Sequence, residues 1–164
     1  MELYVESVRD IEKIENIEIE KRSENVKLLL NELRSNVRQL TEDKEIIISN
    51  DITVDKIQID KGVFFRILEN LLQNALRYAE KQVSINLSHK KDFLILTVKD
   101  DGKGFSAADL EKATTVFYSN DKEKQHFGIG LSVCKILCEK HGGLLYVGNQ
   151  KEKGACVTAK LKSF

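Results

Sequence analysis

Three polar residues on one predicted helix have the types and the spacing of a site for a metal ion and a phosphate. Asn70, Asn74 and Arg77 follow one another at intervals of four and three residues. At about 100° per residue, these intervals place the three side chains within an arc of about 60° on one helix face. Amide oxygens can ligate a cation, and a guanidinium can bind a phosphate. An ordinary solvated helix face remains the alternative that this triplet alone leaves open.

The helix that carries this triplet is predicted from Asp60 to Ala79. Asp60 is a suitable N-cap residue, and the residues that follow it have helical periodicity. The polar triplet lies opposite an apolar face that is expected to pack on the core. The members of this apolar face are Phe64, Ile67, Leu68, Leu71, Leu72 and Ala75.

Two glycine-containing segments further along the chain could complete such a site. Asp100 ends a predicted strand, where its carboxylate can accept a hydrogen bond from an exocyclic amine such as that of adenine. Gly102 and Gly104 follow it and let the backbone approach a flat ring or a phosphate closely. The sequence Gly-Ile-Gly-Leu at 128–131 opens a predicted helix, whose free N–H groups and positive dipole end favour phosphate. Taken singly, each segment is also compatible with a simple turn or loop.

Composition limits the class of protein. The chain has 164 residues, enough for one domain with a sizeable core. Its 26 basic and 26 acidic side chains balance, which argues against a dedicated nucleic-acid binder. No apolar run approaches the ~18 residues of a membrane span, and no secretory signal opens the chain. Three scattered cysteines do not form a disulfide framework, so we expect a reduced, cytoplasmic domain. Such a domain could also be one part of a larger membrane protein.

The order of predicted elements indicates an α+β fold with a mixed, mostly antiparallel sheet. Residues 1–16 are predicted to be the end of a helix whose partner is missing. The remaining elements are a strand at Ile17–Glu20, a helix from a Ser23 cap to Leu40, strands at 45–49 and 57–59, the Asp60 helix, a hairpin of 83–87 and 93–98 with 89–92 as its turn, a short helix opened by a Ser106–Asp109 capping box, a lid at 113–127, a helix that stops at Gly142–Gly143, and a hairpin of 144–147 and 156–161.

Together, and in this order, the segments resemble the ATP-binding domain of sensor histidine kinases. This domain belongs to a superfamily with gyrase, heat-shock chaperone ATPases and mismatch-repair ATPases. The resemblance covers roughly residues 17–161 and implies a Bergerat-type two-layer α/β sandwich with helices on one face of the sheet. The matching segments are Asn70–Tyr78 for the N box, Asp100–Gly104 for the G1 box, Phe117–Tyr118 for a reduced F box, Gly128–Lys135 for the G2 box and Gly154 for the last glycine box.

The resemblance implies that the chain binds ATP with Mg²⁺. Asn74 would ligate the metal ion, Asn70 could touch the metal or its water, Arg77 would contact phosphate, Tyr78 would pack against adenine, and Asp100 would bind the adenine amine. Lys122 and Lys124 in the lid are further candidates for phosphate contact. The expected nucleotide-binding residues are Asn70, Asn74, Arg77, Tyr78, Asp100, Gly102, Gly104, Phe117, Gly128, Ile129, Gly130 and Leu131, with Asn74 as the metal ligand.

Two positions depart from the family pattern. His126 stands where a glycine is common, and Thr114 replaces the first phenylalanine of the F box. Both concern the closed geometry of the lid rather than the nucleotide site.

The position one turn before Asn74 favours a histidine kinase over the hydrolytic and serine-kinase branches. Those branches place a glutamate there as a general base, whereas this chain has Asn70, and Glu69 points about 100° away. Without a base to activate water, bound ATP should be hydrolysed slowly. A neutral imidazole is already nucleophilic and needs less activation.

The resemblance also implies partners. None of His89, His126 and His141 has the expected context of a phosphoacceptor, so the acceptor is expected in a separate dimerisation domain of the parent protein. The γ-phosphoryl group would pass to that histidine and then to a response regulator. Residues 1–16 would be a remnant of the dimerisation helix or linker, and 17–164 the catalytic domain. We expect this part to be monomeric and cytoplasmic, without nucleic-acid or membrane contact, in a membrane-bound parent.

Three alternatives remain open. The chain could belong to the ATPase or serine-kinase branch, or could be a degenerate module that only docks partners. Cys134, Cys138 and His141 also share one helix face and could hold a metal ion, although buried thiols are common and no fourth ligand is evident.

Overall fold

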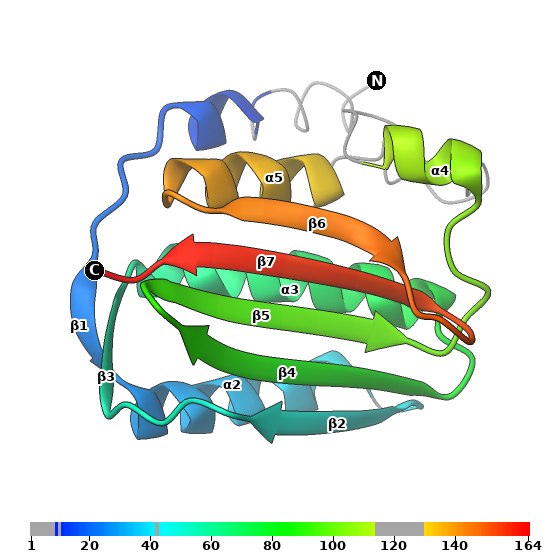
Figure 1. Cartoon of the computed structure of the whole chain (residues 1–164), viewed down its shortest axis with the longest axis horizontal. Helices are drawn as coiled ribbons and strands as arrows, with labels where there is room; N and C mark the ends of the chain where they lie inside the picture. Colours follow the sequence, from blue (N-terminus) through cyan, green and yellow to red (C-terminus); the bar gives the residue numbers. More distant parts are fainter. Residues whose placement is uncertain (1–8, 10, 42, 114–129) are drawn as a thin grey trace.

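The computed structural model describes residues 9, 11–41, 43–113 and 130–164 as two layers, with helices on one face of a five-stranded sheet (Figure 1). The strand order is β2-β4-β5-β7-β6, in which β2 and β4 are parallel and the other pairs antiparallel. The expected fold class is confirmed. The elements are β1 (Arg22–Asn25), α2 (Val26–Leu40), β2 (Glu45–Asn50), β3 (Lys56–Ile59), α3 (Lys61–Tyr78), β4 (Gln82–Lys90), β5 (Phe93–Asp100), α4 (Ala107–Lys112), α5 (Gly130–Lys140), β6 (Leu144–Asn149) and β7 (Ala155–Lys162).

The helix α3 is the centre of the helical layer. Asp60 caps it as predicted, because its Oδ1 accepts a hydrogen bond of 3.1 Å from Val63 N. All six residues of the predicted apolar face are buried, and Phe64 and Leu72 are wholly enclosed. The sheet contributes the facing half of the core from alternate residues of its inner strands, as a sheet with one covered face requires.

The helix α5 runs antiparallel to α3. Near the middle of both helices, Cys134 Sγ donates to Ile67 O at 3.7 Å, and at one end His141 Nε2 accepts from Asp60 N at 3.0 Å. Seven residues separate the two contacts on each helix, so Gly130 lies at about the level of Leu71. The amino end of α5 therefore lies beside the carboxyl half of α3, on the right of Figure 1.

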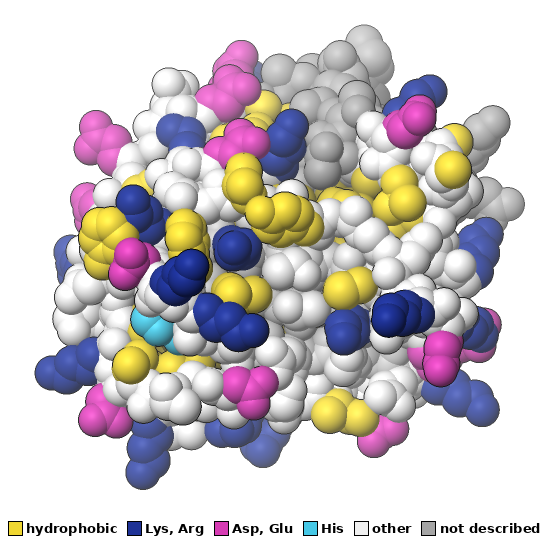
Figure 2. Space-filling model, in the orientation of Figure 1, with side chains coloured by type: hydrophobic (Ala, Val, Ile, Leu, Met, Phe, Trp, Pro, Cys, Tyr) yellow, Lys and Arg dark blue, Asp and Glu magenta, His cyan; other side chains and the backbone are white. Residues whose placement is uncertain are grey.

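The uncovered face of the sheet carries lysines among exposed apolar side chains, as Figure 2 shows. Leu144 and Tyr146 of β6 are each half exposed. The ammonium group of Lys160 lies 5.0 Å from the ring centroid of Phe93 and 6.0 Å from that of Tyr146. Such cation–π contacts place charge directly over apolar surface, which keeps this face compatible with water.

The segment before β1 is held at the end of the molecule opposite the Asp100 loop. Lys140 Nζ donates to Ile17 O at 3.0 Å, and Glu20 N donates to Asp60 Oδ2 at 2.9 Å. Ile14, from the short helical stretch at 11–15, is buried in the core. Within the described residues, none of the helices is both long and apolar enough to span a bilayer.

The start of the chain corrects two predictions. Residues Ile17–Glu20 do not form a strand, and Ser23 does not cap a helix. Instead β1 pairs with β3, and Asn25 caps α2 by accepting a 3.0 Å hydrogen bond from Leu28 N. Ser23 lies within β1, so pairing with a distant strand outweighed the local capping preference. The turn between β4 and β5 is also shorter than expected, with only Lys91 and Asp92, because β4 extends to Lys90.

Gly154 provides a test of how the last hairpin packs on β5. Its φ is +97°, and a Cβ there would lie 1.8 Å from Asp100 O. We expect Gly154→Ala to lower the free energy of unfolding by at least about 2 kcal/mol, through strain and displacement of the hairpin. Gly148→Ala is the control, because its Cβ would meet nothing closer than 3.9 Å. Urea unfolding measures both, and equal stability of the two variants would contradict this account.

Candidate functional site

The carboxylate of Asp100 is buried at the end of β5, with only 4% of the residue exposed. Its Oδ1 accepts hydrogen bonds from Gly102 N at 2.9 Å and from Ala155 N at 3.3 Å. The other oxygen, Oδ2, accepts no hydrogen bond within the described residues. Among those residues, His141 Nδ1 is the only fully buried side-chain atom without a partner, so Oδ2 of Asp100 must retain contact with solvent. Burial raises the pKa of Asp100, and the two backbone donors oppose that shift. The result is a fixed carboxylate with one oxygen available to a ligand.

Two glycines fix the loop that follows Asp100. A Cβ on Gly102 would lie 2.2 Å from Tyr78 O, so the loop packs directly on the end of α3. Gly104 has a φ of +77°. The next residue, Phe105, is held on both sides by Asn149, which accepts from Phe105 N at 2.8 Å and donates to Phe105 O at 2.7 Å. The loop is therefore attached to both α3 and the β6–β7 hairpin.

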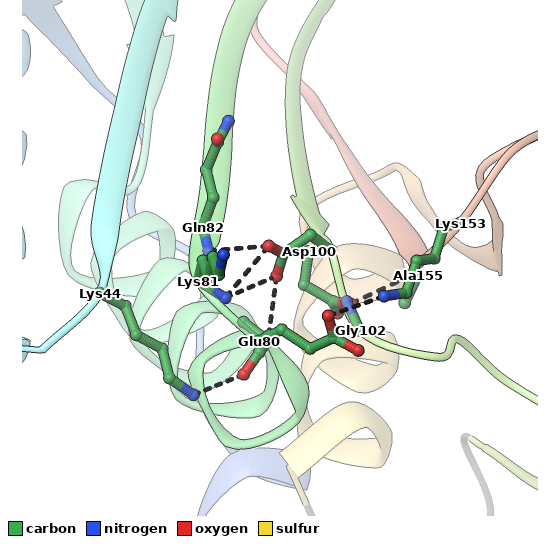
Figure 3. A network of polar contacts seen from close by, with 10 residues as sticks. Lys44, Glu80, Lys81, Gln82, Asp100, Gly102, Lys153 and Ala155 are labelled. Atoms are coloured by element: carbon green, nitrogen blue, oxygen red, sulfur yellow. Dashed lines mark hydrogen bonds and ion pairs between the residues drawn. The ribbon is translucent and has the colours of Figure 1, made fainter.

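Asp101 joins the same loop to the connection between α3 and β4. Its carboxylate accepts hydrogen bonds of 2.8–3.2 Å from the backbone N–H groups of Glu80, Lys81 and Gln82. Burial acts to raise the pKa of Asp101, but these donors outweigh it and the pKa is lowered. Figure 3 shows this network around the end of α3.

Lys44 holds the carboxyl end of α3 from the other side. Its ammonium group donates to Leu76 O and, at 2.7 Å, to Ala79 O. Figure 3 shows Lys44 reaching the end of α3. A cation at this position satisfies carbonyls that the helix leaves unpaired and opposes the negative end of its dipole. The sequence analysis missed both Lys44 and Asp101. Lys44 is more than thirty residues from its partners, and Asp101 follows a more obvious candidate, so neither carries a local signal.

The polar face of α3 has the geometry that its spacing predicts. Asn70, Asn74, Arg77 and Tyr78 are all partly exposed, while Glu69 is exposed. Within the described part of the chain, neither asparagine carboxamide makes a hydrogen bond. The guanidinium carbon of Arg77 lies 5.8 Å from the ring centroid of Tyr78. Two carboxamides without protein partners can accept a cation, and this face therefore fits a bound metal ion.

The structure brings three of the sequence segments to one end of the molecule: the carboxyl half of α3, the loop after Asp100 and the start of α5 (Figure 1). Gly130 is partly exposed, Leu131 is buried, and the first turn of α5 contains no acidic residue that would repel an anion. The remaining candidates lie outside the described residues, and these are Thr114, Phe117, Lys122, Lys124, His126, Gly128 and Ile129.

Two cysteines of α5, and the histidine that follows this helix, have core roles. The thiol of Cys134 donates to a helix carbonyl, and burial raises the pKa of Cys138 to about 12. Burial lowers the pKa of His141, whose Nε2 accepts the Asp60 N–H and is not available to a metal. In 11–41, 43–113 and 130–164, no three His, Cys, Asp or Glu side chains are grouped as metal ligands.

Helices on one face of a mixed, mostly antiparallel sheet define the class of protein as a two-layer domain like the catalytic domains of histidine kinases. The chain belongs to the family of histidine kinase-, DNA gyrase B-, and HSP90-like ATPases, whose model matches residues 59–163. The resemblance given by the sequence motifs is thus confirmed.

Named relatives point to one branch of this family. The chain is 30% identical over 113 residues to the sensor histidine kinase WalK of Bacillus subtilis, and this match covers 64% of the chain and 18% of WalK. It is 38% identical over 109 residues to the sensor histidine kinase SpaK of Bacillus subtilis, covering 63% of the chain and 24% of SpaK. A solved structure of full-length ShkA in complex with AMPPNP has a TM-score of 0.76 and 22% identity, covering 90% of this chain and 32% of ShkA. The chain thus matches about a fifth to a quarter of these curated relatives.

The Asp101 network generates a pH-dependent prediction. Because the folded-state pKa of Asp101 is lowered from 3.8, its stabilising effect is full above 3.8 and is lost as pH falls through the lower folded-state pKa. We expect Asp101→Asn to lower the urea midpoint at pH 7. The difference from the unsubstituted protein should narrow below about pH 3.8, as its carboxyl group becomes protonated. Asp92→Asn, an exposed carboxylate in the β4–β5 turn, is the control and should leave the midpoint unchanged. A difference that stays constant with pH would exclude this role for the charge.

Proposed function

We propose that the chain binds ATP with Mg²⁺ at the end of α3, between the loop after Asp100 and the start of α5. The observation that carries this proposal is the buried Asp100 carboxylate, whose Oδ1 is occupied by two backbone donors while Oδ2 retains solvent contact. A fixed acceptor of this kind selects a donor such as the exocyclic amine of adenine over the carbonyl of guanine.

The other residues take roles that match their positions. Asn74 would hold Mg²⁺ through its free carboxamide oxygen, with Asn70 one turn away near the metal or its water. Arg77 would bind phosphate, and the Tyr78 ring would pack against adenine. The backbone at Gly102 and Gly104 would form the wall of the adenine site, and the amino end of α5 at Gly130 and Leu131 would face the phosphates. The bound metal ion would neutralise charge on the triphosphate.

In the parent protein, the reaction we propose is phosphoryl transfer to a histidine. The bond between the γ-phosphorus and the bridging oxygen breaks, ADP leaves, and a nitrogen–phosphorus bond forms on an imidazole of a separate dimerisation domain. The phosphoryl group then passes to an aspartate of a response regulator. The names of WalK and SpaK support this branch, and the AMPPNP complex of ShkA supports the nucleotide. Residues 1–16 would link this domain to the acceptor domain, and the domain would act in the cytoplasm as part of a membrane-bound sensor.

The ATPase and serine-kinase branches are the second candidate. Glu69 is exposed, whereas the position of their general base is taken by the uncharged and partly exposed Asn70. The isolated chain should therefore bind ATP but turn it over slowly. Rapid hydrolysis without a partner would support the ATPase branch, and no binding at millimolar ATP would support a docking module.

Asn74→Ala tests the metal site. We expect the Mg²⁺-dependent part of ATP binding to be lost, with affinity reduced by about tenfold or more, because the metal loses its protein ligand. Calorimetric titration with ATP, in Mg²⁺ and then in a chelator, measures this. Gln73→Ala is the matched control, since it removes a neighbouring exposed amide from the same helix. An Asn74→Ala protein that keeps its full response to Mg²⁺ would remove Asn74 from the proposed site.

Substitutions of Asp100 test base selection. Asp100→Ala should lose the preference for adenine over guanine nucleotides. Asp100→Asn can still accept from the backbone through its oxygen but presents an amide donor in place of Oδ2, so selectivity should shift toward guanine by about tenfold or more. Competition between ATP and GTP measures the ratio. Unchanged selectivity in both folded variants would refute the role of Asp100.

A further inference from the structure

A cavity lies between α2 and the edge strand β2, and its lining contains none of the residues proposed to bind the nucleotide. Its volume is about 380 Å³, within the usual range for small-molecule sites. Val37, Ile46 and Ile48 supply apolar surface. Val37 is buried, but both isoleucines remain partly exposed, so the two elements do not close over one another.

Positive charge surrounds this apolar surface. Arg34 and Arg38, one helical turn apart on α2, line the cavity together with Lys44. Both arginines are exposed, and neither forms an ion pair within the described part of the chain. None of the described lining residues is acidic. An apolar slot with two unpaired guanidinium groups at its border is complementary to a small molecule that is apolar at one end and anionic at the other.

From this arrangement we infer that the cavity between α2 and β2 binds a small amphipathic anion, with its chain against Val37, Ile46 and Ile48 and its carboxylate or phosphate on Arg34 and Arg38. Guanidinium groups bind both kinds of anion in a forked geometry, so the charged head fixes the orientation. The apolar part contributes affinity in proportion to the area that it removes from water.

Octanoate is the probe that tests the site, by calorimetric titration of the whole chain without nucleotide. We expect saturable binding of one octanoate per chain. The uncharged analogue 1-octanol should bind at least about tenfold more weakly than octanoate because it lacks the charge. Acetate should also bind at least about tenfold more weakly, because it lacks the apolar chain. Octyl phosphate, compared with inorganic phosphate, distinguishes a phosphate head from a carboxylate. Equal binding of octanol and octanoate would overturn the inference. The absence of saturable octanoate binding would also overturn it, and this is the result expected if the surface instead binds an acidic protein segment.

Paired variants locate the site. Arg34→Gln with Arg38→Gln should weaken octanoate binding by about tenfold or more. The control is Arg22→Gln with Lys27→Gln, which removes the same charge from exposed positions outside the cavity and should leave the affinity unchanged. Ile48→Phe places a larger side chain in the apolar part of the cavity, and phenylalanine is a residue with high β-propensity. This substitution should also reduce octanoate binding because less space remains for the apolar chain. Equal loss in the two double variants would show that only net charge matters and would refute the site.

One residue, Lys44, connects the cavity with the end of α3 that carries the proposed nucleotide site. Lys44 lines the cavity and also donates to Leu76 O and Ala79 O at the end of α3. An anion that attracts this ammonium group would weaken its hydrogen bonds to these two carbonyls, which lie next to Arg77 and Tyr78 in the sequence.

This coupling rests on the proposed function, whereas octanoate binding itself does not. We expect saturating octanoate to weaken ATP binding by about fivefold or more, and ATP to weaken octanoate binding by the same factor. Octanoate binding with unchanged ATP affinity would refute the coupling alone.

Discussion

The site depends on one constraint, which is that the carboxyl end of α3 is fixed against the end of β5. In the proposed site the helix provides the carboxamides and the arginine, and the strand provides Asp100, so the site requires a constant separation between the two elements. Gly102 permits the contact because any larger residue would meet Tyr78 O. Lys44 and Asp101 then hold the helix end through its carbonyls and the following N–H groups. The fixed geometry therefore comes from backbone groups, which leaves the carboxamides of Asn70 and Asn74 without a partner among the described residues.

The sequence predicts the parts of this arrangement that depend on local chemistry. The Asp60 cap, the buried face of α3, the Ser106–Asp109 capping box and the alternation in β4 and β5 all follow from spacing and residue type. The predictions at Ile17–Glu20 and Ser23 were wrong because β1 is defined by its pairing with β3. The role of Lys44 could not be predicted from the sequence. Its partners are backbone carbonyl groups, which every residue has, and they lie far from Lys44 in the sequence. The roles of all the site residues stay predictions, and Phe117, Gly128 and Ile129 lie outside the described residues.

The same physical reasoning connects the chemistry of the site with its surroundings. A buried carboxylate at Asp100 carries a desolvation cost that two backbone donors partly offset. By contrast, Cys134, Cys138 and His141 are buried in protonation states without charge, and they serve the packing of α5 on α3. Burial alone thus does not identify a functional group. The difference lies in whether an atom of the group remains open to a ligand, as Oδ2 of Asp100 does.

The contacts of residues 17–20 have a mechanical consequence. Ile17 is tied to the last residue of α5 and Glu20 to the cap of α3, so the incoming chain is attached to the two helices rather than to the sheet. A displacement of residues 17–20 would therefore act first on the adjacent ends of α3 and α5. The walls of the proposed nucleotide site lie at the other ends of these two helices, so the chain that precedes β1 is attached to the same two elements that carry the site.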